Sequence, residues 1–231
     1  MISPHPDDET IGCGGTIARL AEEGVNVFIQ AISVGNAARL GGESVVDVRQ
    51  VEFSAACEAL GASGSDILWT DESRHMRLNI HPTDDLVKAL ESEARYSLRT
   101  VQPDLVLMPA AGSYNQDHAA VHRAAYIAVR PHDPKVKPVP RIVLGYRTPE
   151  EQGWANSTER ATTIVDTSGS WRRKEKALRC YSSQIWEGQH PRSYGHIEDL
   201  DRAAGGTLGL QFAERFVCYR FLSGRESSSR G

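Results

Sequence analysis

Short apolar runs alternate along this chain with longer amphipathic segments, and this alternation constrains the fold more than any other feature. The apolar runs are rich in β-branched residues and short enough to be buried strands. The amphipathic segments carry apolar residues at helical spacing, and several end at a Gly or before a Pro. The predicted strands are residues 25–34, 66–70, 104–110 and 141–148, and the predicted helices are residues 16–24, 45–62, 84–103, 119–130 and 171–181. Residues 35–44 are predicted as a loop, and residues 210–222 as a last helix or strand.

Strands that alternate with helices form βαβ units, so the sequence predicts an α/β fold. It would be Rossmann-like, with a mostly parallel sheet flanked by helices. Ligands in such folds bind at the carboxyl ends of the strands, in the loops that lead into helices. Two loops of this kind, residues 3–9 and 111–118, are rich in His and Asp. We therefore expect both loops at one edge of the sheet, with the active site between them.

The composition is that of one ordinary globular domain. The chain has 231 residues, of which 40% are hydrophobic and 24% charged, and this length suffices for one buried core. We expect a single domain over residues 1–222 and a disordered tail over residues 223–231. A net charge of −4 lacks the basic excess of nucleic-acid binders, and no apolar run approaches 18 residues. With four scattered cysteines and no signal peptide, we expect a cytoplasmic protein without nucleic-acid or membrane partners.

The run HPDD, residues 5–8, supplies groups that bind a metal ion and move a proton. An imidazole and a carboxylate three residues apart, on a bend at Pro6, can face one point and bind Zn²⁺. The other carboxylate then stays free to act as a general base. A catalytic zinc site needs about three protein ligands, so a third should come from another loop on the same sheet edge. The sequence NQDH offers Asp117 and His118 there.

The same residues resemble a known family, the LmbE-like (PIG-L) zinc-dependent N-deacetylases. SPHPDDETIGCGGTIARLAEEG resembles the HPDDE signature of that family, and NQDHAAVHRAA is similar to its second motif, HxDH. Three further stretches resemble family segments: VRQVEFSAACEALG, KEKALRCYSSQ and GLQFAERF. The resemblance covers most of the chain from residue 3 to about residue 220, and HPDDE followed by a Gly-rich helix start is its most specific part.

The resemblance implies a role for each matching residue. His5, Asp8 and His118 would be the zinc ligands, and Asp7 would be the general base that takes a proton from zinc-bound water. The reaction would be hydrolysis of an N-acetyl group from a small acetylated amino sugar or a glycoside that carries one. Fe²⁺ is an alternative to Zn²⁺, because His and carboxylate ligands accept both ions. A homo-oligomer is also compatible with the resemblance.

The chain departs from the family pattern in two places. Asn115 stands where many members have the first His of HxDH, and an Asn can donate a hydrogen bond to an oxyanion but cannot act as an acid. His190 and His196 in the sequence QHPRSYGH are candidates for protonating the leaving amine, and we favour His196. The chain also begins four residues before His5, where members usually carry a full first strand, so we expect a short first strand or one missing its beginning.

Other residues admit a structural and a functional interpretation. The acidic run alone would suit a helix N-terminus. Glu9 could equally have a capping or hydrogen-bonding role in the first turn or a direct catalytic one. Asp117 could cap its helix or orient a partner. Arg49 could reach the site to hold substrate, or pair with Glu52 on the surface. Trp186 is the Trp that we expect to stack on a sugar. Three further interpretations are structural: close helix packing for Gly12, Gly14 and Gly15, packing or indirect support for His122, and solvated loop positions for His75 and His81.

Two other functions compete with the deacetylase. A zinc amidase or deacylase for longer acyl groups would use the same ligands and a different pocket. A catalytically impaired, metal-dependent sugar-binding relative would explain Asn115, although a binding protein has no need of the free base Asp7.

Overall fold

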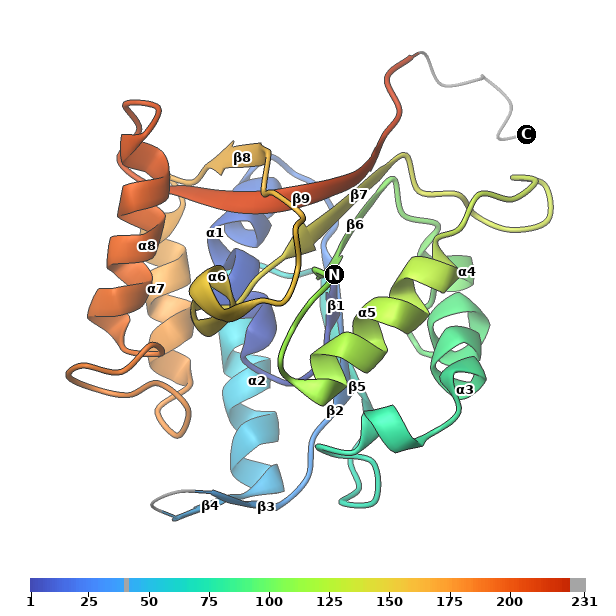
Figure 1. Cartoon of the computed structure of the whole chain (residues 1–231), viewed down its shortest axis with the longest axis horizontal. Helices are drawn as coiled ribbons and strands as arrows, with labels where there is room; N and C mark the ends of the chain where they lie inside the picture. The colour runs from blue at the N-terminus through green and yellow to red at the C-terminus, as the bar shows by residue number, and fades with distance from the viewer. Residues whose placement is uncertain (40–41, 225–231) are drawn as a thin grey trace.

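A layer of strands runs through the centre of the molecule, and helices cover both of its faces (Figure 1). The computed structural model describes residues 1–39 and 42–224, so the predicted tail lies outside the described residues from residue 225 onward. The strands are β1 (Ile2–Ser3), β2 (Phe28–Ser33), β3 (Ala37–Arg39), β4 (Gly42–Ser44), β5 (Gly64–Trp69), β6 (Leu105–Pro109), β7 (Ile142–Tyr146), β8 (Thr163–Asp166) and β9 (Ala213–Phe221). The α-helices are α1 (Asp8–Glu22), α2 (Val46–Leu60), α3 (Thr83–Lys88), α4 (Leu98–Val101), α5 (Gln116–Ala128), α6 (Pro149–Trp154), α7 (Trp171–Cys180) and α8 (Tyr194–Gly206).

Two of the three sheets of the described residues meet at β1 and β6, and the third is the separate β3–β4 pair. The first sheet has the order β1-β2-β5 and is parallel, with Ile2 opposite Gln30. The second has the order β6-β7-β9-β8, where β6 and β7 are parallel and β9 runs antiparallel to both of its neighbours. β1 lies against β6, which brings the parallel strands of both sheets together. The predicted α/β architecture is confirmed, with an antiparallel part at the β8–β9 end.

Each face of the strand layer has its own group of helices and its own hydrophobic core. On one face α1, α2 and α7 pack against one another, and α8 packs on β9. This core includes Ile17, Leu60 and Phe216. On the other face α3 packs against α5, around a core that includes Met108 and Val121. No helix of the described ranges is long and apolar enough to cross a membrane.

Helix α1 is kinked at Cys13, whose φ of −154° and ψ of 26° are not helical. The kink leaves backbone N–H groups of the following turn without partners inside the helix. The Glu214 carboxylate on β9 accepts hydrogen bonds from the N–H of Gly15 at 2.9 Å and of Thr16 at 2.8 Å. A residue nearly 200 positions away in the sequence therefore caps the second half of α1.

The glycines of α1 allow this helix to lie close to its neighbours. A Cβ added to Gly12 would lie 2.2 Å from Cδ2 of Tyr146, and one added to Gly15 would lie 2.8 Å from Cβ of Thr167. Both distances are far below van der Waals contact, so only Gly fits. The prediction that these glycines serve close packing is confirmed.

Several predicted elements have different limits in the structure. The predicted helix 84–103 is broken into α3, a π-helical turn η2 (Ala89–Glu93) and α4, and the Gln30 side chain accepts the N–H of Tyr96 at the break. The predicted loop 35–44 contains the β3–β4 hairpin. Helices α6 and α8 and strand β8 were not predicted, because their segments lack a strong hydrophobic period.

Candidate active site

Loops that follow three parallel strands converge at the carboxyl end of the strand layer. His5, Asp7 and Asp8 follow β1, Asp117 and His118 follow β6 at the start of α5, and Glu151 follows β7 in α6. All six side chains are buried. This is the sheet edge at which the sequence places the two polar loops, and it is where open α/β sheets bind their ligands.

The side chains of His5, Asp8 and His118 come together as a cluster with the donor set of a metal site. Their potential ligand atoms all lie within 4.8 Å of one another. Nδ1 of His5 lies 3.5 Å from Oδ2 of Asp8, and Nε2 of His118 lies 3.1 Å from the same oxygen. Two His nitrogens and one carboxylate are the ligand set of many catalytic zinc sites, in which a fourth position stays open.

The cluster contains buried polar atoms that a metal ion would satisfy. Among the described residues Oδ1 of Asp8 has no hydrogen-bond partner, and Nε2 of His118 has only its ion-pair contact with Oδ2 of Asp8, which does not have hydrogen-bond geometry. Burial alone would lower the pKa of His118, but the carboxylates of Asp8 and Glu151 outweigh it and raise this pKa to about 10. A site that holds so much negative charge around two imidazoles favours a divalent cation.

In each imidazole of the cluster, the ring nitrogen that faces away from Asp8 contacts a second carboxylate. Nε2 of His5 lies 3.0 Å from Oδ2 of Asp117, and Nδ1 of His118 lies 3.1 Å from Oε1 of Glu151. A carboxylate can only accept, so both of these nitrogens carry protons. The opposite nitrogens, which face Asp8, are the ones left to bind an ion. These contacts of Asp117 fit the interpretation that it orients a partner, and its other oxygen accepts the N–H of Leu78 at 2.9 Å.

Asp7 lies beside the cluster in a strained and charged position. Its φ of 115° is uncommon for a residue other than Gly, and its N–H donates to Glu9 Oε2 at 3.0 Å. Oδ2 of Asp7 lies 3.2 Å from Nη1 of Arg192 and 3.4 Å from Nη2 of Arg49. Burial raises the pKa of Asp7 although both arginines oppose this shift. A carboxylate with a raised pKa takes up a proton more readily than an ordinary one, which suits a group beside a cation site that accepts a proton.

Glu9 supports the backbone of the motif. Its carboxylate also accepts hydrogen bonds from the Tyr181 hydroxyl at 2.6 Å and the Thr10 hydroxyl at 2.7 Å. Burial raises the pKa of Glu9 to about 7. Of the two interpretations that the sequence leaves open for Glu9, its contacts fit the hydrogen-bonding one.

Asn115 caps helix α5. Its Oδ1 accepts the N–H of Asp117 at 2.9 Å, which is the usual contact of an Asn at this position. His122, one turn after His118, bonds through Nδ1 to the Pro109 carbonyl at 2.9 Å and packs beside Tyr126. It is not a member of the cluster, which fits the packing interpretation.

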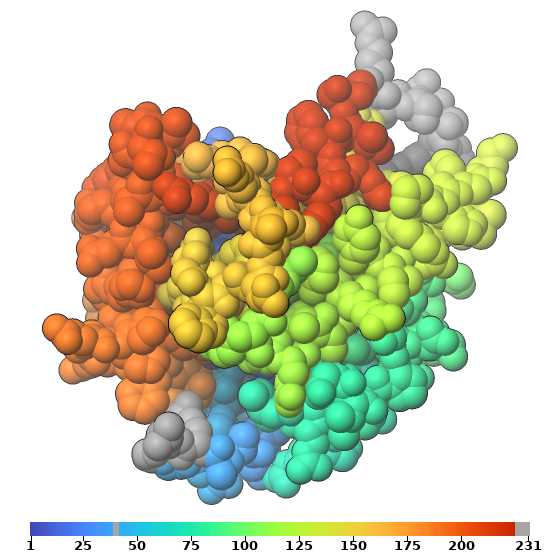
Figure 2. All heavy atoms as spheres, in the orientation of Figure 1, coloured from blue at the N-terminus to red at the C-terminus, as the bar shows by residue number. Residues whose placement is uncertain are grey.

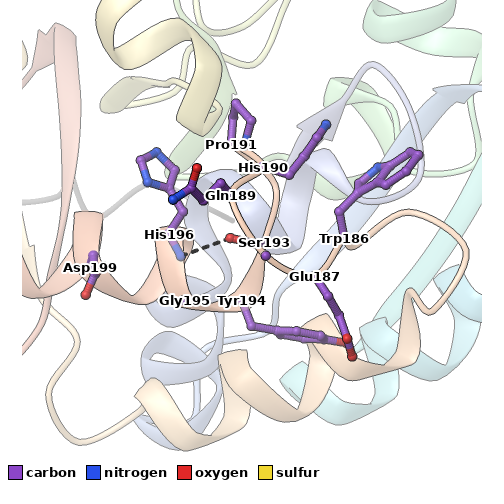
Figure 3. A pocket seen from close by; sticks show the side chains of 11 residues that line it. Trp186, Glu187, Gln189, His190, Pro191, Ser193, Tyr194, Gly195, His196 and Asp199 are labelled. Carbon is purple, nitrogen blue, oxygen red and sulfur yellow. Dashed lines mark hydrogen bonds between the residues drawn. The ribbon is translucent and has the colours of Figure 1, made fainter. Parts of the chain in front are cut away.

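His196 and Trp186 line a groove of about 780 Å³ at the start of α8 (Figure 3). The Trp186 ring stacks on the ring of His190, with centroids 4.9 Å apart. Both His196 and Trp186 are exposed, and within the described residues the His196 ring makes no hydrogen bond or ion pair. The loop that carries this groove reaches the cluster through Arg192, which contacts Asp7.

The structure excludes one of the two interpretations of Arg49 and corrects the expectation for His75. Arg49 and Glu52 do not pair on the surface: Arg49 is buried and donates to the Pro6 carbonyl, whereas Glu52 accepts from Ser183. His75 is not a solvated loop residue, because it is 7% exposed and packs edge to face against His5 at 5.1 Å. Burial lowers the pKa of His75 to about 4.

Sequence reasoning missed two residues of the site, Arg192 and Glu151. Arg192 stands in a polar loop with no periodic pattern, so nothing local marked it. Glu151 had a signal, since Thr148 and Glu151 form a capping box and Pro149 stands in the first turn, a combination typical of a helix start.

Comparison with known proteins agrees with this geometry. A family model described as GlcNAc-PI de-N-acetylase (PIG-L) matches residues 1–129, more than half of the chain. The chain belongs to the PIG-L family. The resemblance inferred from the HPDDE and NQDH motifs is confirmed.

Individual PIG-L relatives match over long stretches. The uncharacterized deacetylase YaiS of Escherichia coli is 32% identical over 150 residues, which cover 64% of this chain and 72% of that protein. The 1D-myo-inositol 2-acetamido-2-deoxy-alpha-D-glucopyranoside deacetylase of Rhodococcus erythropolis is 25% identical over 239 residues, which cover 80% of each chain.

Solved structures share the PIG-L fold over nearly the whole chain. The conserved protein TT1542 from Thermus thermophilus has a TM-score of 0.75 and 25% identity, covering 98% of this chain and 96% of that one. GalB, a 4-carboxy-2-hydroxymuconate hydratase from Pseudomonas putida, has a TM-score of 0.73 and 22% identity, covering 97% of this chain and 96% of that one. Because the same fold is found in a hydratase, fold alone does not decide which reaction this chain catalyses.

Proposed function

We propose that this PIG-L protein is a metal-dependent hydrolase that removes an N-acetyl group from an amino sugar or from a glycoside that carries one. The observation that carries this proposal is the buried cluster of His5, Asp8 and His118 with the carboxylate of Asp7 beside it. The names of the deacetylase relatives support the acetylated amino-sugar class of substrate.

In the proposed mechanism His5, Asp8 and His118 hold a divalent ion, with zinc as the expected metal. When bound, such an ion polarises the amide carbonyl and lowers the pKa of a water molecule. Asp7 accepts a proton from the attacking water, whose oxygen bonds to the acetyl carbon. The carbon–nitrogen bond then breaks, the amine takes up a proton, and acetate and a free amine leave. Arg49 and Arg192 hold the Asp7 carboxylate in place.

The proton of the leaving amine has two proposed donors. Asp7 holds a proton after the first step and lies beside the cluster, so it can return that proton without any second group. His196 stays a prediction as the other donor, and its exposed position on α8 would have to approach the substrate. Asn115 cannot take this role, because an amide is no acid.

The groove that contains Trp186 is the proposed surface for the sugar or its aglycone. Trp186 and Tyr194 offer aromatic faces, and Glu187, His190 and Asp199 offer polar groups around them (Figure 3). This mixture suits a sugar ring, which has apolar faces and polar edges.

Two variants separate the roles of the groove residues. We expect Trp186→Ala to raise KM several-fold for a glycoside with kcat unchanged, because it removes binding that ground state and transition state share. We expect His196→Ala to lower kcat with metal content unchanged if the imidazole protonates the amine. Steady-state kinetics of both variants check this, and wild-type kcat in His196→Ala leaves Asp7 as the donor.

Metal content and product analysis test the proposed function directly. We expect about one zinc per chain in the wild type, and a large loss of bound zinc in His118→Ala, because two ligands hold the ion far more weakly than three. The metal-loaded wild type should release acetate and amine in equal amounts from acetylated amino sugars. Release of longer acids would favour the amidase alternative, and bound sugar without turnover would favour the binding alternative. A wild type that binds no zinc even when zinc is added contradicts the proposal.

A further inference from the structure

Helix α6 holds two parts of the site at once, although it has only six residues (Figure 1). Figure 2 shows its segment at the surface between α5 and α8. Its first turn contains two adjacent acids, Glu150 and Glu151, and each reaches a different side chain of the site. Resting on the function proposed above, we infer that this turn is a positioning element that sets the orientation of both His118 and Asp7.

Glu151 orients His118. Its Oε1 accepts from Nδ1 of His118 at 3.1 Å and from the Ser113 hydroxyl, and its Oε2 accepts the N–H of Thr148 at 3.0 Å. The side chains of His118 and Glu151 are 2% and 3% exposed, so water does not compete for this bond. The proton of His118 is therefore kept on Nδ1, and Nε2 is kept available on the side of Asp8. Carboxylates in this position behind a ligand His raise its basicity and fix its ring.

Glu150 acts on Asp7 through Arg192. The guanidinium of Arg192 donates from Nε to Glu150 and from Nη1 to Asp7, the latter at 3.2 Å. Held at two points, this guanidinium fixes the direction from which it meets the Asp7 carboxylate. Adjacent residues of one helix turn thus set the geometry of the metal ligand and of the base. This turn is anchored by the N–H of Thr148, which donates to Oε2 of Glu151, and by Pro149 at its first position, so it is a rigid support for both.

The test compares Glu151→Gln with a control that weakens the same helix without touching His118. Gln has the size of Glu, but its amide group can turn its NH₂ toward Nδ1 of His118 and so favour a proton on Nε2, which then cannot bind the ion. Thr148→Val removes the capping hydroxyl of α6 and keeps the backbone N–H that binds Glu151. Zn²⁺ affinity, measured by competition with a chromophoric chelator at fixed pH, is the readout, and thermal melting reports the structural cost of each variant.

We expect Glu151→Gln to weaken Zn²⁺ binding about 10- to 100-fold, and Thr148→Val to lower Tm with an affinity within about twofold of the wild type. We expect Glu150→Gln to keep wild-type Zn²⁺ affinity and to lower kcat about tenfold, because only the base is disturbed. Wild-type affinity in Glu151→Gln, or an equal loss in Thr148→Val, overturns the positioning role and leaves the proposed function intact. A wild-type protein that binds no Zn²⁺ overturns both.

Discussion

Replacing Asp7 by Asn should lower kcat by about two to four orders of magnitude while the protein stays folded and keeps its metal. Asn has nearly the size of Asp and tolerates the positive φ of this position better than most residues. Its amide oxygen can still accept from Arg192. The variant can no longer accept a proton. This change raises the free energy of the transition state and leaves substrate binding unchanged.

Three measurements make this prediction specific to the base. Bound zinc per chain should match the wild type, because Asp7 is not one of the three clustered ligands. KM should change little. The matched control is Asp84→Asn, which makes the same chemical change at an exposed carboxylate on α3 and should leave kcat unchanged. Turnover of Asp7→Asn equal to the wild type removes Asp7 from the role of base.

The part of the site that is local in sequence could be predicted from sequence. His5, Asp7 and Asp8 lie within four positions, and the βα order places their loop beside the loop of His118. Metal binding and proton transfer each require particular residue types, so the types of His5, Asp7, Asp8 and His118 indicate this chemistry from the sequence alone.

The supporting residues could not be predicted in the same way. Arg192 meets Asp7, and Glu151 meets His118, only because loops after β7 and α7 fold back over the sheet edge. His75 was predicted as a solvated loop residue, yet it is buried and packs against His5. Loop paths of this kind depend on tertiary packing, which hydrophobic periodicity does not encode.

The same limit applies to the fold. Strands β2, β5, β6 and β7 were predicted because each is a short apolar run bounded by turn residues. In the break of the predicted helix 84–103, the Gln30 side chain on β2 accepts the N–H of Tyr96. The sequence of the helix itself does not show a hydrogen bond to a distant strand.

We expect replacement of Lys174 to lower the free energy of unfolding more than replacement of any other single charged residue. Its ammonium group is fully buried and donates to Glu214 at 2.6 Å and to Asp201 at 2.7 Å. Glu214 in turn caps the second half of α1. Replacing Lys174 by Met keeps much of the apolar stem and leaves two carboxylates without a cation, which should lower the free energy of unfolding by about 3–5 kcal/mol. Denaturant unfolding measures this change.

The pH dependence identifies the cause of that loss. In the wild type burial raises the pKa of Asp201 to about 7 although Lys174 opposes this shift. Without Lys174 the folded-state pKa of Asp201 rises further above the unfolded value of about 4, because the cation that opposed the shift is gone. The folded state then binds protons more tightly than the unfolded state, so stability falls as the pH rises through the folded pKa. The destabilisation of Lys174→Met should therefore be smaller at pH 5 than at pH 8.

Lys176→Met, at an exposed position of the same helix, should stay within about 0.5 kcal/mol of the wild type at both pH values. An equal loss at both pH values would show that lost packing, rather than unpaired charge, destabilises Lys174→Met.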